Sequence, residues 1–192
     1  MTKIAVWCRH QDDNIIGIGP EIPWRVSSDF KRFRRITEGQ NLVVGERTYE
    51  SFPNRTLPNR KIHILTFNAD YEVSDKENHF VETDVNRFKE FEESLYVCGG
   101  ASIYKLFICG HTTLKPDIIV DSCFLGDLNP ELKGEPVDIT SCVDVMKAEY
   151  FKLPQEYEQD NVLTTIWIKK GDFVEQSVVR HIINAIENKG EM

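Results

Sequence analysis

The sequence predicts an α/β fold in which a largely parallel β-sheet carries an antiparallel hairpin at one edge. Over the first 124 residues, short apolar runs rich in β-formers alternate with stretches of helical periodicity, which is typical of crossover units. Two further strand-like runs, 143–153 and 162–170, are joined by a polar turn and favour a hairpin. The 192 residues, 41% of them hydrophobic, suit one domain with a full-sized core.

The composition argues against several classes of function. The formal net charge of −8 disfavours general binding to nucleic acid or to an anionic membrane. The five cysteines are odd in number and include no C-x-x-C pair, so neither a disulfide framework nor a metal site is expected. A reducing, cytoplasmic compartment is the natural expectation. No apolar segment approaches the length of a membrane span.

The expected elements follow from local patterns along the chain. Residues 27–37 show helical spacing, with Ser27 and Ser28 as candidate N-cap residues and Asp29 in the first turn. A second helix is expected over 84–93, capped by Asp84, and an amphipathic helix after residue 171. Six apolar runs are expected as strands, at 3–8, 41–44, 62–67, 79–82, 95–98 and 117–124.

The stretch from Gly17 to Thr37 joins an irregular segment to the first helix. Glycines and prolines prevent a regular element over 17–24, which predicts a lid. Asp29 shares a helix face with Phe33 and Ile36. A carboxylate on an apolar face needs a polar partner, and a protonated nitrogen heterocycle would supply one. An ordinary solvated aspartate is the alternative on this stretch alone.

Two strand ends that carry glycine offer backbone N–H groups to phosphates. Gly45 precedes Arg47 and Thr48 after the second strand, and Gly99-Gly100 follows the fifth. Plain β-to-α turns are the competing interpretation at both places. Arg60, in a proline turn, presents a planar fork suited to an acidic ligand tail, or else is a solvated turn arginine.

Six motifs in register between Ile4 and Tyr104 resemble the dihydrofolate reductase family. They are I-A-V, I-I-G-I-G-P-E-I-P-W, S-S-D-F-K-R-F, V-V-G-E-R-T-Y-E-S-F, L-P-N-R-K and V-C-G-G-A-S-I-Y. The resemblance implies a three-layer fold with a mixed, mainly parallel eight-stranded sheet over residues 1–171, and it leaves 172–192 as a helical extension. It also implies hydride transfer from NADPH to C6 of 7,8-dihydrofolate, giving 5,6,7,8-tetrahydrofolate.

The same resemblance implies roles for individual residues. Asp29 is expected to hold the pterin ring and assist N5 protonation, with Ile22 and Trp24 in the closing lid. Arg60 is expected to grip the glutamate tail. The other residues expected at the substrate are Ile4, Ala5, Val6, Phe30, Phe33, Arg34, Phe52, Arg55, Leu57 and Cys98. Those expected at the cofactor are Ala5, Ile16, Gly17, Ile22, Gly45, Arg47, Thr48, Leu65, Thr66, Cys98, Gly99, Gly100, Ala101, Ser102, Ile103 and Tyr104.

Two positions depart from the family pattern. Glu46 stands where the family usually has a basic residue for the cofactor 2′-phosphate, so discrimination against NADH is expected to rest on Arg47. The threonine that supports the pterin-binding acid is replaced by Asp121, or by Ser122 if the register slips. If Asp121 approaches Asp29, like-charge coupling raises the pKa of one of them.

Other interpretations stay open at this point. A related pyrimidine reductase of riboflavin synthesis shares the fold class, although Arg60 speaks against it because that substrate has no glutamate tail. A non-catalytic pterin- or nucleotide-binding protein of the same fold is favoured by Glu46 and disfavoured by Asp29 and Trp24. The C-terminal helix is expected to pack onto its own sheet in a monomer, with a dimer interface as the alternative.

Overall fold

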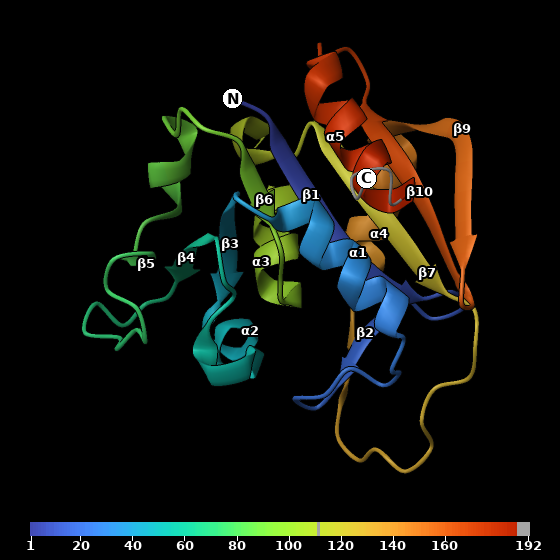
Figure 1. The fold of residues 1–192 in the computed structure, drawn as a ribbon, viewed down its shortest axis with the longest axis horizontal. Coiled ribbons are helices and arrows are strands. Elements are labelled where there is room, and N and C mark those ends of the chain that lie inside the picture. The colour runs from blue at the N-terminus through green and yellow to red at the C-terminus, as the bar shows by residue number, and fades with distance from the viewer. Residues whose placement is uncertain (111, 188–192) are drawn as a thin grey trace.

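The computed structural model describes residues 1–110 and 112–187, which form three layers around one sheet (Figure 1). Eight strands pair in the order β5-β4-β3-β6-β1-β7-β10-β9. Neighbouring strands run parallel except at β10, which is antiparallel to both β7 and β9. The predicted mixed, mainly parallel sheet with an antiparallel hairpin at its edge is therefore confirmed.

The expected elements occur in the expected order, but two short strands, 15–18 and 136–138, were not predicted, and the first of them covers Gly17, where an irregular segment was expected. The strands of the main sheet are β1 (Lys3–His10), β3 (Asn41–Gly45), β4 (Lys61–Leu65), β5 (His79–Glu82), β6 (Leu95–Val97), β7 (Ile118–Phe124), β9 (Tyr150–Gln159) and β10 (Val162–Lys169). A separate antiparallel pair joins β2 (Ile15–Ile18) to β8 (Pro136–Asp138). The α-helices are α1 (Ser27–Thr37), α2 (Glu46–Ser51), α3 (Ala101–Lys105), α4 (Thr140–Glu149) and α5 (Gln176–Glu187).

Alternate residues of β1 point to opposite faces of the sheet and so enter two different cores. Ile4 and Val6 pack on the side covered by α1 and α5. Ala5 and Trp7 pack on the side covered by α3 and α4. Both faces of the central strands are buried, which is why these strands have continuous apolar sequences.

One predicted strand is wrong, because residues 143–149 belong to α4. Their alternation of apolar and polar side chains resembles a strand, but Cys142, Val143 and Met146 are buried together on one face of a helix. The side chain of Asp138 accepts a hydrogen bond from the Thr140 N–H at 2.9 Å, next to the start of that helix. Packing of the apolar face outweighs intrinsic β-propensity here. The first strand of the hairpin therefore begins only at Tyr150.

Two predicted helix boundaries also need correction. The N-cap of α1 is Val26, and neither Ser27 nor Ser28 caps it, since both lie within the helix. The helix expected over 84–93 is a short 3-10 helix, Val85–Lys89. Asp84 does cap it, because its side chain accepts a hydrogen bond from the Asn86 N–H at 2.9 Å.

The C-terminal helix α5 packs on its own chain. Ile182 and Ile186 are buried in the same core as Ile36 of α1. Arg35 Nε donates a hydrogen bond to the carbonyl of Ala185 at 2.7 Å. Like the other helices of the described residues, α5 lacks the length and apolar composition of a membrane span.

Candidate active site

Asp29 lies in the first turn of α1 and faces the end of β1. Its side chain is 18% exposed, and Arg32 Nη1 donates to its Oδ1 at 3.4 Å. Burial raises the pKa of Asp29, while the charge of Arg32 and a hydrogen bond from the Cys8 thiol act in the opposite direction. The arrangement therefore presents a largely desolvated carboxyl group that is suited to exchange a proton with a bound ligand.

Arg32 is a partner of Asp29 that was not expected from the sequence. Its side chain is 2% exposed, and its Nε has no hydrogen-bond partner within the described residues. Burial lowers the pKa of Arg32, and the carboxylate of Asp29 opposes that shift. The i, i+3 spacing from Asp29 was the available signal, because residues three apart share a helix face.

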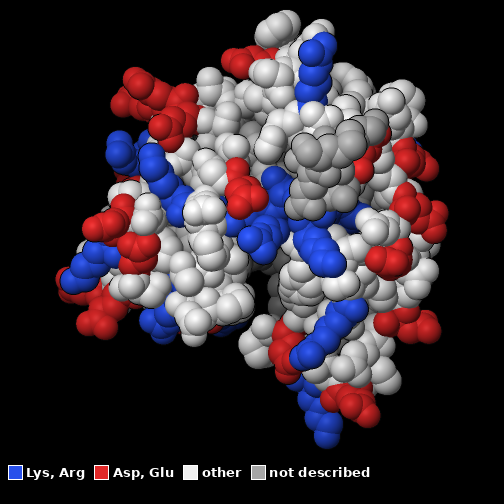
Figure 2. All heavy atoms as spheres, in the orientation of Figure 1, with Lys and Arg blue, Asp and Glu red and all other residues white. Residues whose placement is uncertain are grey.

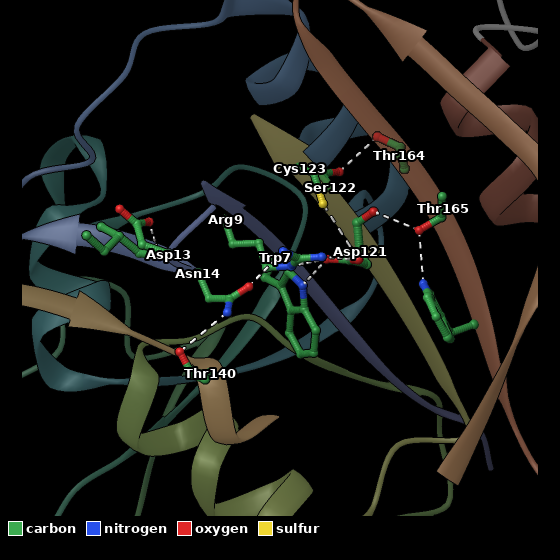
Figure 3. Close-up of polar contacts among 12 residues, drawn as sticks. Trp7, Arg9, Asp13, Asn14, Asp121, Ser122, Cys123, Thr140, Thr164 and Thr165 are labelled. Atoms are coloured by element: carbon green, nitrogen blue, oxygen red, sulfur yellow. Dashed lines mark hydrogen bonds and ion pairs between the residues drawn. The ribbon is translucent and has the colours of Figure 1, made fainter. Parts of the chain in front are cut away.

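Asp121 does not lie beside Asp29, which corrects the first of the two expected registers. β7 pairs with β1 so that Asp121 lies opposite Trp7 and Ser122 opposite Cys8. The Asp121 carboxylate therefore points to the other face of the sheet, where it binds Arg9 (Figure 3). The condition for like-charge coupling with Asp29 is not met.

Ser122, the alternative position, lies on the Cys8 side of the sheet, which is the side that Asp29 faces. Its hydroxyl is 2.9 Å from Thr164 Oγ1 of β10. The hydroxyls of Ser122 and Thr164 therefore lie on the Asp29 side of the sheet. They belong to β7 and β10, which come next after β1 in the order of strands across the sheet.

The two lid residues with predicted roles, Ile22 and Trp24, differ in burial. Trp24 is buried and stacks on Phe124 at the end of β7, with the ring centroids 5.1 Å apart. The carbonyl of Pro23 accepts a hydrogen bond from the Asn129 N–H at 2.9 Å. Ile22 is 48% exposed, so the structure does not enclose it. The predicted lid is thus fixed at its end and open at its middle.

Many of the predicted cofactor residues lie where neighbouring parallel strands end, which is where ligands of open α/β sheets bind. They occupy β1 (Ala5), β2 (Ile16 and Gly17), the start of α2 (Gly45, Arg47 and Thr48), the end of β4 (Leu65 and Thr66) and the segment from β6 into α3 (Cys98, Gly99, Gly100, Ala101, Ser102, Ile103 and Tyr104). Ile22 lies in the lid.

β3 and β6 end side by side, and glycines occupy the closely packed positions there. The Gly45 N–H donates to the Gly99 carbonyl at 2.8 Å. A Cβ at Gly100 would lie 3.2 Å from Thr48 Oγ1, and a Cβ at Gly45 would lie 3.2 Å from Ile103 Cγ1. A side chain at either position would thus require Thr48 or Ile103 to shift by a few tenths of an ångström.

Tyr104 connects this cofactor segment to β1. Its hydroxyl donates to the Val6 carbonyl at 2.7 Å, and its ring packs edge-on against Trp7 with the centroids 5.4 Å apart. Burial raises the pKa of Tyr104, so the hydroxyl keeps its proton. At the opposite side of the site, the Thr66 hydroxyl donates to the Glu46 carboxylate.

The predicted substrate residues fall into a buried group and an exposed group. Phe33, Phe52 and Leu57 are partly buried and pack against the core that contains Ile4, Val6 and Cys98. Phe30, Arg34 and Arg55 are exposed. Arg55 Nη2 lies 3.6 Å from Glu50 Oε1, a contact at half-exposed side chains.

Arg60 is buried, with its guanidinium against the end of α1. Its Nε donates to Thr37 Oγ1 at 3.2 Å, and its other two nitrogens donate to the carbonyls of Pro58 and Arg34. Each of the two terminal nitrogens carries a second N–H group. A carboxylate can accept one hydrogen bond from each of these two N–H groups. Arg60 is therefore not a solvated turn arginine.

Basic side chains gather on α1 beside Arg60. Lys31, Arg34 and Arg35 line a cavity of about 560 Å³ that also borders the turn between β9 and β10. Figure 2 shows Lys and Arg atoms together near the middle of this face, above a hollow in the surface. The carboxylates of Glu38 and Asp160 also line the cavity, so an acidic group that enters it meets a small excess of positive charge although the whole protein is acidic.

A protein-family model described as dihydrofolate reductase matches residues 3–141. A dihydrofolate reductase of Enterococcus faecium is 32% identical over 158 residues, covering 81% of this chain and 85% of that protein. One of Mycoplasma pneumoniae is 32% identical over 160 residues, covering 78% and 97%. A solved structure of dihydrofolate reductase from Enterococcus faecalis complexed with NADP(H) and RAB-propyl has a TM-score of 0.67 at 20% identity, covering 88% and 96%. The chain belongs to the dihydrofolate reductase family.

Proposed function

We propose that the protein reduces 7,8-dihydrofolate to 5,6,7,8-tetrahydrofolate with NADPH. The observation that carries this proposal is Asp29, a largely buried carboxyl group with a raised pKa at the end of β1. The other parts that we assign to the site are the lid, the glycine-bearing ends of β3 and β6, and Arg60. Membership of the family supports the same assignment.

The residues at the strand ends fit a dinucleotide cofactor. Gly45 and Gly100 directly precede α2 and α3, and neither carries a side chain that would block the approach of a phosphate to the backbone. Arg47 is exposed beside them and offers a cation to a phosphate. NADPH, when bound, supplies the hydride that reduces the substrate.

Asp29 has two tasks in this proposal. It accepts hydrogen bonds from the pterin ring and so orients the substrate against β1. It also favours a proton on N5, which makes the adjacent C6 a better hydride acceptor. Trp24 and Ile22 exclude water when the lid closes. Arg60, with the basic surface of α1 beside it, anchors the glutamate tail.

The wider assignments remain proposals of the same kind. We assign the catalytic unit to residues 1–171 and treat 172–192 as an extension, of which 188–192 lie outside the described residues. A monomer in the cytoplasm is our proposal for the state of the protein. The burial of Ile182 and Ile186 in the chain's own core supports it, because that face of α5 is then already covered.

An absorbance assay tests the proposed reaction directly. We expect the protein to oxidise NADPH when dihydrofolate is added, and to oxidise NADH at a rate that depends on Glu46. The Glu46 carboxylate, held by Thr66, lies where a 2′-phosphate would need a cation, so discrimination between the two cofactors should be small for a reductase of this family.

Binding of NADPH without oxidation would contradict the reaction and favour a binding protein. Turnover of a reducible pyrimidine in place of dihydrofolate would favour the riboflavin-pathway alternative.

Arg32 offers a second test, because it adjusts the pKa of the proposed acid. Replacing Arg32 by leucine should move the falling limb of the pH profile for hydride transfer to higher pH. The charge of Arg32 favours ionised Asp29, so its removal raises the pKa of Asp29 further and the protonated carboxyl persists to higher pH. Single-turnover rates as a function of pH measure the shift. Lys31→Leu, at the exposed neighbouring position, is the control; a limb that stays in place in Arg32→Leu would contradict the role.

A further inference from the structure

A buried ion pair lies behind the active site, on the face of the sheet opposite Asp29. Asp121 accepts hydrogen bonds from Arg9 Nε at 2.8 Å and from Arg9 Nη2 at 2.9 Å, and a third from Trp7 Nε1 at 2.7 Å (Figure 3). Arg9 and Asp121 are 7% and 2% exposed. Two strands of the rigid sheet therefore hold the guanidinium in a fixed orientation.

The remaining guanidinium nitrogen of Arg9 reaches out of the sheet to Asn14. Arg9 Nη1 donates to Asn14 Oδ1 at 2.7 Å. Asn14 in turn donates from Nδ2 to Thr140 Oγ1, at the start of α4, at 3.4 Å. Its backbone carbonyl accepts from the Ile139 N–H at 3.1 Å. Asn14 is thus the point where β1, β7 and α4 are tied together.

Asn14 is also the residue directly before β2, which leads into the lid. Its φ of 58° lies in the left-handed region that asparagine tolerates better than most residues. β2 pairs with β8, and the Gly19 N–H donates to the Glu135 carbonyl at 3.0 Å. The start of the lid segment thus pairs with a surface strand and its end packs through Trp24 on β7, whereas Asn14 connects its base to the buried Arg9.

We propose that Asn14 is a positioning residue that sets the base of the lid, residues 17–24, through Arg9 and Asp121. A charge-assisted hydrogen bond from a buried guanidinium is directional, so it fixes the side chain of Asn14 and with it the direction in which β2 leaves β1. The lid then closes from a defined starting point. The catalytic consequence rests on the proposed reductase function; the structural consequence does not.

Asn14→Gly is the variant that isolates this contact. Glycine adopts the left-handed backbone conformation without strain, so only the amide and its two hydrogen bonds are lost. Asn161→Gly is the matched control, because Asn161 has a φ of 60° in the exposed turn between β9 and β10. Asn14→Asp keeps the acceptor for Arg9 and serves as the conservative variant.

Hydrogen exchange on the protein alone gives the first readout. In Asn14→Gly the amides of residues 15–24 should exchange about tenfold faster, while those of β7 keep their protection. Asn161→Gly should leave 15–24 unchanged, and Asn14→Asp should restore most of the protection. Equal exchange of 15–24 in both glycine variants would overturn the proposal. So would faster exchange spread evenly over the sheet, because that indicates general destabilisation.

Single-turnover hydride transfer gives the second readout. Asn14→Gly should slow it roughly tenfold or more, because small displacements of a closing segment are costly at the reacting atoms. A hydride-transfer rate equal to that of Asn161→Gly would overturn the catalytic part. If the wild type oxidises neither cofactor while exchange of 15–24 still responds to Asn14, the reductase function fails and the positioning role stands.

Discussion

Replacing Asp29 by asparagine is expected to slow dihydrofolate reduction by roughly 10²- to 10⁴-fold, the range lost when a general acid is removed. Asparagine keeps an oxygen to accept a hydrogen bond from Arg32, so the side chain remains accommodated. It has no proton to exchange and no charge to favour protonated N5. Steady-state assays and single-turnover hydride transfer should show the loss in the rate constant for reduction.

The matched control for Asp29→Asn is Asp144→Asn, at an exposed position on α4, which covers the face of the sheet opposite Asp29. It removes the same charge from the protein and should leave the rate unchanged. A second check is the pH dependence: the wild-type rate should fall as pH rises through the raised pKa of Asp29, and Asp29→Asn should lose that dependence. Full activity in Asp29→Asn would remove Asp29 from the reaction.

The second large effect is expected at the buried pair of Arg9 and Asp121. Arg9→Met should lower the free energy of unfolding by about 3–5 kcal/mol, because it leaves a desolvated carboxylate without its cation. The double variant Arg9→Met with Asp121→Leu should recover part of that loss, since no charge is then buried alone. Trp7 Nε1 still loses its acceptor there, which costs about 1–3 kcal/mol.

Urea denaturation of the single and double variants measures this coupling. Lys152→Met is the control, because Lys152 and Glu156 form an exposed ion pair on β9 with a 2.6 Å contact. Exposed pairs contribute about 1 kcal/mol or less. If Arg9→Met costs no more than Lys152→Met, the Arg9 pair is not a determinant of stability.

Most of the sheet could be predicted because its strands are buried on both faces. Such strands are continuous apolar runs that end at glycine, proline or polar residues, as at Gly45 and Gly99. Residues 143–149 could not be assigned in this way. Their apolar positions fit a short strand and a helix equally well, and only the packing of Val143 and Met146 against the core decides between the two.

In the candidate site too, some residues could be predicted from local sequence and others could not. Helical spacing placed Asp29 on the inner face of α1, and Gly45 and the pair Gly99-Gly100 marked two strand ends, both from local pattern. Arg32 was missed because an arginine on an amphipathic helix is usually solvated. The local sequence could not decide whether Asp121 or Ser122 faces Asp29. A shift of one residue in the strand register moves every side chain of a strand to the opposite face of the sheet.

The sequence by itself determined most strands of the main sheet, the first helix and the position of Asp29 in its first turn. These depend on residues close together in the chain, whose periodicity and backbone preferences act locally. The tertiary structure alone decided the partners of the buried charges. Arg9 meets Asp121, and Asp29 rather than Asp121 meets Cys8, because the register of β7 on β1 is fixed by packing across more than a hundred residues of chain.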